Sequence, residues 1–334
     1  MQRKRKGRLA MNGPPKFHPQ VRAMMEREKG SSIGSITNYA PAEYRRIVKA
    51  TPNRTKRAPE EVGKFEETSF PGPSGDLPLR VYWPKGAKGK EKLPVLVYYH
   101  GGGFVAGSAE EMDPTCRRLA NRARHLVVSV GYRLAPEDKF PAAPEDCFAA
   151  LVWTQKNASS LGGDPSRIAV AGSSAGGNLA AVVAILARER EGPKISRQVL
   201  VYPVTDLTRS LRKFSKSGFG PTDLEMKYCY RHYLTAPDDA KDPRASPLLG
   251  DLHGLPPAIV VTAEYDTLTE QVDDYAAKLR EGGVKVRSRQ FPGMMHGFFM
   301  EPDDLDTAEE AIDWVASELT KPKVPASRPR RTGL

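Results

Sequence analysis

The sequence predicts an α/β fold in which helices cover both faces of a mostly parallel sheet. Short apolar runs alternate with longer segments whose apolar residues recur at helical spacing. This order is typical of parallel strands joined by crossover helices. Several of the runs, such as VLVYY at 95–99, are continuously apolar, which indicates strands buried on both faces of the sheet.

Eight segments are expected to form the strands of this sheet. The first two flank the turn-rich segment PGPSGD, so we expect them to pair as an antiparallel hairpin at one edge. The predicted strands are 65–70, 79–83, 95–99, 126–131, 168–171, 198–202, 258–263 and 284–291. Core helices are predicted at 144–156, 175–190, 269–281 and 307–319. Gly192-Pro193 and Gly282-Gly283 follow the second and third of them, as expected at helix C-termini.

Two segments fall outside this alternation. Residues 1–50 contain helical patterns near 17–29 and 42–50, and residues 207–247 contain no clear strand but many aromatic side chains. A long insertion in a compact domain is usually a lid or binding element, so we expect the two segments to meet as a cap. Alternatively, the aromatic residues pack a small helical subdomain. The expected organisation is a basic tail with cap helices (1–50), the core in two parts (51–206 and 248–320), a cap insertion (207–247) and a second tail (321–334).

The net charge of +11 lies almost entirely at the two ends of the chain. Residues 1–8 and 321–334 each contain five basic side chains and no acidic one. A nucleic-acid-binding fold instead carries positive charge on a folded face, usually with aromatic side chains among the basic ones. The distribution therefore argues against a nucleic-acid partner and favours two solvated tails, with polyanion tethering as the minor alternative.

Cysteine usage and hydropathy predict a cytoplasmic protein. Cys116, Cys147 and Cys229 are far apart and lack CxxC spacing, which fits a reducing compartment. No apolar run approaches the roughly 18 residues of a membrane-spanning helix. The basic start is not followed by the apolar stretch of a signal peptide. No membrane partner is expected, and a homodimer is left open.

A GxSxG pattern places Ser174 between the predicted strand IAVA and a predicted helix. The pattern alone is a weak signal, but its context strengthens it. A sharp strand-to-helix turn needs small neighbours, because its central residue is held in strained geometry, and Gly172, Ala175 and Gly176 supply them. Such a turn presents the serine hydroxyl beside a helix N-terminus, which favours developing negative charge. Ser174 is thus the predicted nucleophile, with a structural N-cap serine as the alternative; Ser173 is expected to point elsewhere.

A glycine-rich loop, His100-Gly101-Gly102-Gly103-Phe104, directly follows the strand VLVYY. Consecutive glycines let backbone N–H groups approach a ligand, as stabilisation of a tetrahedral oxyanion requires. A phosphate-binding loop is the competing interpretation, but GxGxxG spacing and a P-loop lysine are both missing. His100 is interpreted as a residue that fixes this loop rather than as a base.

Among six histidines, His296 is the best candidate for the base that a serine nucleophile needs. It lies in the segment GMMHGF just after the last predicted strand and downstream of Ser174. The matching acid is expected between serine and histidine in chain order. Asp266 follows the strand AIVVTA, at the strand end where sites in open parallel sheets gather. Glu264 is the nearest rival.

With these residues in place, the chain resembles the bacterial hormone-sensitive-lipase family of carboxylesterases. The resemblance covers about residues 65–320 and depends on five motifs in order: HGGGF (100–104), YRLAPE (132–137) with FPAAPED (140–146), GGDPSRIAVAGSSAGGN (162–178), EYD (264–266) and HGF (296–298). It implies an α/β-hydrolase fold with eight strands and a helical cap, and hydrolysis of short- to medium-chain acyl esters without cofactor or metal. By analogy, Gly102, Gly103 and Ala175 would donate the oxyanion N–H groups. Candidate substrate contacts are Phe104, Phe214 and Phe219.

The chain departs from the family pattern at two positions. Ser173 stands where many members have Asp beside the nucleophile, and Gly131 stands where Asp often precedes the tyrosine of YRLAPE. Neither departure removes a predicted catalytic residue. Two other functions are kept as alternatives: a catalytically silent ligand-binding receptor on the same fold, and an amide or lactone hydrolase.

Overall fold

A computed structural model describes residues 15–28, 33–51, 58–87, 92–211 and 220–322. Its centre is an eight-stranded sheet in the order β1-β2-β4-β3-β5-β6-β7-β8. The strands are β1 Lys64–Gly72, β2 Gly75–Trp83, β3 Leu93–Tyr99, β4 Leu126–Val130, β5 Gly163–Ser173, β6 Ile195–Val201, β7 Ala258–Tyr265 and β8 Val286–Met295. The pairs β1–β2 and β2–β4 are antiparallel, and the other neighbouring strands pair parallel. The mostly parallel sheet and its edge hairpin are confirmed.

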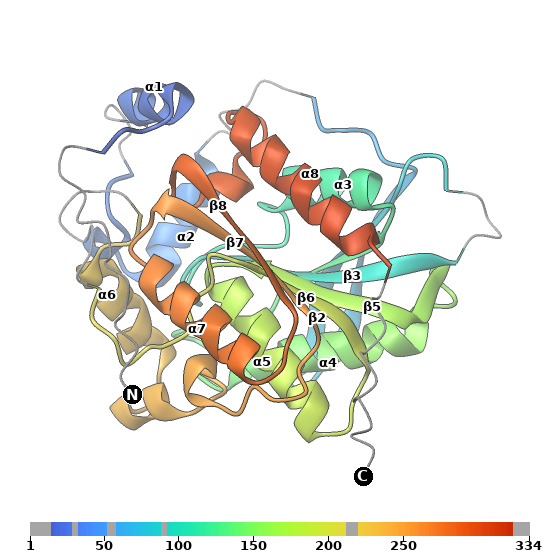
Figure 1. The fold of residues 1–334 in the computed structure, drawn as a ribbon. Helices are drawn as coiled ribbons and strands as arrows, with labels where there is room; N and C mark the ends of the chain where they lie inside the picture. Colours follow the sequence, from blue (N-terminus) through green and yellow to red (C-terminus); the bar gives the residue numbers. More distant parts are fainter. Residues whose placement is uncertain (1–14, 29–32, 52–57, 88–91, 212–219, 323–334) are drawn as a thin grey trace, which may run out of the picture.

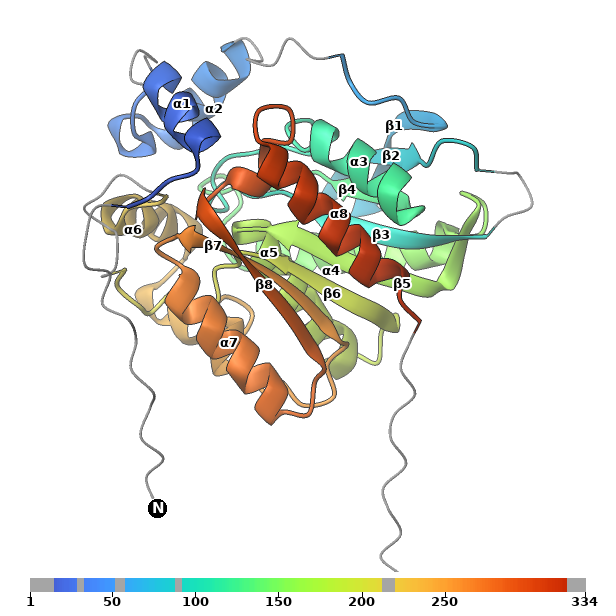
Figure 2. The same ribbon diagram turned by 45° about the horizontal axis from the view of Figure 1, so that its top comes forward.

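Helices cover both faces of the sheet, as predicted. On one face lie α3 (Asp113–Ala123) and α8 (Asp306–Thr320), which contact each other. The opposite face carries α4 (Ala142–Asn157), α5 (Ala175–Glu189) and α7 (Thr269–Glu281), as Figures 1 and 2 show. Short 3₁₀ turns occur at Pro237–Lys241, Pro247–Leu249 and Phe298–Met300.

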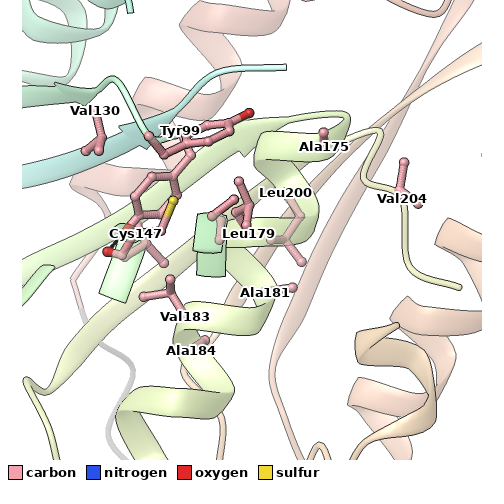
Figure 3. Packing of buried hydrophobic residues seen from close by; sticks show 14 of the residues in the cluster. Tyr99, Val130, Cys147, Ala175, Leu179, Ala181, Val183, Ala184, Leu200 and Val204 are labelled. Atoms are coloured by element: carbon pink, nitrogen blue, oxygen red, sulfur yellow. Dashed lines mark hydrogen bonds between the residues drawn. The ribbon is translucent and has the colours of Figure 1, made fainter. Parts of the chain in front are cut away.

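Two apolar cores result, one on each face of the sheet. The larger one joins α4, α5 and α7 to the sheet, and Figure 3 shows its part around Tyr99, Cys147 and Leu179. Its helix α5 is buried from Ala175 to Ala187, which explains why that segment is apolar around its whole circumference rather than amphipathic. The second core lies beneath α3 and α8. Because β3 to β8 run parallel, their carboxyl ends lie at the same edge of the sheet, and the site residues lie there.

Helix α3 is missing from the helices predicted above. Its buried residues Cys116, Leu119, Ala120 and Ala123 do follow helical spacing, but all except the leucine are small, and arginines stand between them. Arg118 of this helix is itself buried, in ion pairs with Asp303 and Glu309. A charged side chain therefore lies on the packed side of the helix, and its long-range partners conceal the amphipathic pattern.

The two segments outside the alternation lie side by side. Helices α1 (Pro19–Glu28), α2 (Pro41–Ala50) and α6 (Asp223–Tyr233) gather at the end of the sheet toward which β7 and β8 run (Figures 1 and 2). The Tyr228 hydroxyl of α6 donates to the Tyr39 carbonyl at 2.6 Å. Tyr230 and Tyr233 are buried, so aromatic residues of the insertion also pack its helix, as the alternative interpretation predicted.

Candidate active site

Ser174 stands at the turn between β5, which ends at Ser173, and α5, which begins at Ala175. Its backbone has φ 54° and ψ −117°, a conformation that costs an L-residue energy and persists only when its surroundings enforce it. The Ser174 amide donates to the Val201 carbonyl of β6 at 2.9 Å, and its own carbonyl accepts from Asn178 at 3.0 Å. The turn is therefore held by both the sheet and the helix.

The strands β7 and β8 bring an acid and a base to the same place. Asp266 directly follows β7 and His296 directly follows β8. Nδ1 of His296 lies 2.8 Å from Oδ2 of Asp266, and Nε2 lies 3.0 Å from Oγ of Ser174. Because an ionised carboxylate only accepts hydrogen bonds, the Nδ1 position carries the proton and Nε2 is left to accept from the serine hydroxyl. The three residues chosen from the sequence form one hydrogen-bonded chain.

Further contacts fix the orientation of this chain. Asp266 is buried, and its other oxygen accepts from the Leu268 amide at 2.8 Å. The Tyr202 ring packs against the imidazole of His296 with the ring centroids 4.5 Å apart. The rival acid Glu264 instead accepts from the Gly293 amide at 2.8 Å. Its carboxylate supports the loop before His296 and is not its hydrogen-bonded partner.

The glycine loop after β3 has the irregular backbone that its composition predicts. Gly102, Gly103 and Phe104 all have positive φ, at 116°, 63° and 67°. The loop closes on itself where Ala106 donates to the Gly102 carbonyl at 2.9 Å, and a Cβ at Gly102 would stand 2.1 Å from the Ala106 carbonyl oxygen. Only glycine fits there. Ala175 is the first residue of α5, so its N–H has no partner within the helix.

His100 is a structural residue in this loop. It is buried, its ring stacks on Tyr132 with centroids 4.1 Å apart, and its Nδ1 donates to the Gly101 carbonyl at 2.7 Å. Burial lowers the pKa of His100 to about 4, although the bond to Gly101 acts in the opposite direction. His100 is thus neutral at physiological pH.

A second buried histidine allows this burial effect to be tested away from the site. Burial also lowers the pKa of His125 to about 4. The unfolded chain binds a proton near pH 6.5 and the folded chain only near pH 4, so folding stability falls as the pH drops through this window. We expect His125→Gln to reduce the stability lost between pH 7 and pH 5 by about 2 kcal/mol. Urea unfolding at both pH values measures this, and equal losses in both proteins would contradict it.

The predicted substrate contacts fare differently. Phe104 is fully buried and its ring stacks on Tyr233 of α6 with centroids 4.0 Å apart. The ring of Phe104 thus packs against the cap helix, and contact of this side chain with substrate stays a prediction. Phe214 and Phe219 lie outside the described residues. Ser173 points away from the triad as expected, with its hydroxyl 3.5 Å from the Met300 sulfur.

Two surface hollows in the described part of the chain lie away from the triad. One of about 830 Å³ lies beside α4 and α5 and is lined by residues such as Phe148, Pro165 and Lys194. Another of about 650 Å³ lies next to the cap, lined by residues such as Leu207 and Tyr230. Neither lining includes a triad residue. The site is therefore located by the geometry of its side chains.

No metal or membrane feature accompanies the triad in the part of the chain that the structure describes. Within it, histidine, cysteine, aspartate and glutamate side chains nowhere gather into a group of three or more suited to a metal ion. Among the same residues, no helix combines the length and apolar character needed to cross a bilayer.

Comparison with known proteins agrees with this geometry. Residues 96–300 match a family model described as an alpha/beta hydrolase fold. The carboxylesterase NlhH of Mycobacterium tuberculosis is 41% identical over 269 residues, covering 78% of this chain and 84% of that protein. An arylesterase of Saccharolobus solfataricus is 37% identical over 289 residues, covering 85% and 92%.

Solved structures lead to the same family. The structure of a hyperthermophilic esterase from the archaeon Pyrobaculum calidifontis aligns with a TM-score of 0.82 at 39% identity, covering 92% of this chain and 98% of that one. Fold, motif order and similarity along most of the chain all agree. The chain therefore belongs to the α/β-hydrolase family, among the serine carboxylesterases of the hormone-sensitive-lipase type that its motifs resemble.

Proposed function

We propose that this carboxylesterase works through Ser174 as nucleophile, His296 as general base and Asp266 as the acid that orients the imidazole. The observation that carries the proposal is the continuous chain from Asp266 Oδ2 through His296 to Ser174 Oγ, with contacts of 2.8 and 3.0 Å. These distances lie within the range over which a base takes a proton from a hydroxyl. The burial of Asp266 strengthens its interaction with the imidazolium that forms.

The reaction proceeds in two acyl-transfer steps. His296 Nε2 accepts the proton as Ser174 Oγ bonds to the ester carbonyl carbon, and the carbonyl oxygen becomes an oxyanion. The N–H groups of Gly102, Gly103 and Ala175 bind that oxyanion in our proposal. The imidazolium then protonates the departing alkoxide, leaving an acyl-enzyme. Water repeats the sequence, with His296 as its base, and releases the carboxylic acid.

The proposed substrate class rests on the family to which the chain belongs. We infer short- to medium-chain acyl esters, with residues 1–50 and 207–247 acting as a cap over the triad. The receptor alternative is not favoured, because such a protein has no need of an assembled nucleophile, base and acid.

The three cysteines are free and buried, and a cytoplasmic location stays our prediction. Residues 1–14 and 323–334, which hold most of the basic side chains of the two ends, lie outside the described residues.

A covalent probe tests the proposed nucleophile directly. We expect a fluorophosphonate to label the native chain at Ser174, and mass spectrometry of the digested protein to identify that peptide. Ser174→Ala should lose both labelling and hydrolysis of p-nitrophenyl butyrate, whereas Ser173→Ala should still be labelled. Full activity of Ser174→Ala, or labelling at another serine, would overturn the assignment. A chain-length series of p-nitrophenyl esters then measures the acyl preference.

A further inference from the structure

The backbone just before α6, residues 220–222, lies against the proposed base. A Cβ added at Gly220 would stand 2.8 Å from Cβ of His296, 3.8 Å from its Cγ and 3.9 Å from its amide nitrogen. Gly220 has φ +93°, a conformation that side chains disfavour. Backbone of the 220–222 segment therefore packs directly on the proposed base, near Cβ of His296, whereas Tyr202 packs against its imidazole ring.

A hydrogen bond joins the same segment to the loop of the proposed acid. Thr267 immediately follows Asp266, is almost fully buried, and donates from Oγ1 to the Pro221 carbonyl at 2.9 Å. The next amide, that of Leu268, donates to Asp266 Oδ1. One short turn thus holds both the carboxylate and the 220–222 segment. A shift of the segment would be transmitted to the acid and to the histidine together.

The other end of the segment is fixed by the cap. Thr222 is the N-cap of α6 and forms a capping box with Glu225. The Thr222 amide donates to the Glu225 carboxylate at 2.8 Å, and the Glu225 amide donates to the Thr222 hydroxyl at 3.1 Å. The second oxygen of Glu225 accepts from the Ser35 hydroxyl at 2.7 Å. Ser35 belongs to the N-terminal part of the cap. Hydrogen bonds therefore run from the N-terminal segment through α6 to the residue beside Asp266.

We propose that Gly220 and Thr267 are positioning residues, which hold the 220–222 segment against His296 and so keep the imidazole in line between Asp266 and Ser174. This inference rests on the proposed triad. Neither residue needs to touch the substrate. The cap then does more than shape a binding space, because its 220–222 segment also holds the catalytic histidine in place. The required fit is tight: a misplacement of about 1 Å can cost on the order of 10²-fold in rate.

Removing the Thr267 hydroxyl is the first test. Thr267→Val keeps the shape of the side chain but cannot donate to Pro221. We expect kcat for p-nitrophenyl butyrate to fall about 10- to 100-fold, with KM changed less than about twofold, because ground-state binding is not the affected step. Thr267→Ser restores the donor and should restore most of kcat. This rescue separates loss of the bond from damage to the fold.

Thr235→Val is the matched control, since Thr235 also donates from the cap to a core carbonyl, that of Phe140, at 3.0 Å. It should keep the native kcat. An equal fall in kcat for Thr235→Val and Thr267→Val would overturn the proposal, because any loosening of the cap would then suffice. A native kcat in Thr267→Val would also overturn the proposal.

Gly220→Ala tests the contact with His296 independently of the threonine. We expect kcat to fall at least as far as in Thr267→Val, because the nearest atom is a Cβ that cannot move without moving the histidine. Gly283→Ala is the control for backbone strain, with φ +78° and no atom within 4 Å of the added methyl. Equal loss of kcat in both glycine variants would assign the effect to strain alone and overturn the contact. If the native chain were not labelled at Ser174, the proposed triad itself would fail; labelled native protein with unaffected variants refutes only the positioning role.

Discussion

Replacing His296 with alanine is expected to lower kcat for p-nitrophenyl butyrate by about 10⁴-fold or more, while the chain stays folded. His296 Nε2 is 3.0 Å from Ser174 Oγ, and without a base the hydroxyl is a poor nucleophile. The alcohol leaving group also loses its proton donor, so both acyl-transfer steps are affected. Initial rates under saturating ester measure the loss, and circular dichroism checks the fold.

A second histidine–aspartate pair in this chain supplies a close control. Nδ1 of His253 lies 2.7 Å from Oδ1 of Asp251, close to the 2.8 Å of the proposed pair, but the His253 side chain is 77% exposed. His253→Ala should therefore retain native kcat. More than a tenth of the native rate in His296→Ala, in protein free of wild-type contamination, would rule out His296 as the base.

Replacing Gly176 with alanine is expected to damage both stability and activity. An added Cβ would stand 2.0 Å from the Tyr99 carbonyl oxygen and 2.4 Å from that of His100. Both are backbone atoms, so α5 must move away from β3 and carry Ser174 with it. Overpacking in a buried site costs about 1–3 kcal/mol, and more where the backbone cannot yield. We expect at least about 3 kcal/mol of lost stability and at least about a 10²-fold loss of kcat.

A glycine just beyond the C-terminal end of the same helix offers a matched control. A methyl group at Gly192 would meet the edge of the half-buried Phe148 ring at 3.1 Å, and a side-chain ring can shift more easily than the backbone. Gly192→Ala should therefore lose little stability and no activity. Thermal unfolding measures the stability of both variants, and ester hydrolysis measures their activity. Equal stability of Gly176→Ala and native protein would show that the turn is looser than these contacts imply.

The strands of this fold could be predicted because a strand buried on both faces is a continuous apolar run in the sequence. Runs such as VLVYY and AIVVTA are apolar throughout and bounded by turn residues, and each became a strand, β3 and β7. Helix α3 could not be read in the same way. Its packed side includes Arg118, whose charge is compensated by Asp303 and Glu309, about 190 positions away. A partner so distant in the chain leaves no local pattern.

The predicted site residues show the same division. Ser174, Asp266 and His296 could be chosen because each follows a strand and their order is the one this fold uses. The stacking of the Phe104 ring on Tyr233 of the cap could not be predicted, since nothing in HGGGF reveals it. Tyr202, Gly220 and Thr267 were not singled out at all. Their contacts with the triad and with the 220–222 segment join parts of the chain that are far apart in sequence.

The sequence by itself determined the layered sheet and the strand-to-helix turn at Ser174, and it was sufficient to choose Asp266 and His296 as the proposed acid and base. These features depend on local backbone needs and on chain order. Only the tertiary structure decided how Ser174, His296 and Asp266 align and what holds them. Alignment at 2.8 and 3.0 Å depends on three strand ends and one cap segment meeting in space. Such distances arise from packing between elements, which residue patterns along the chain do not encode.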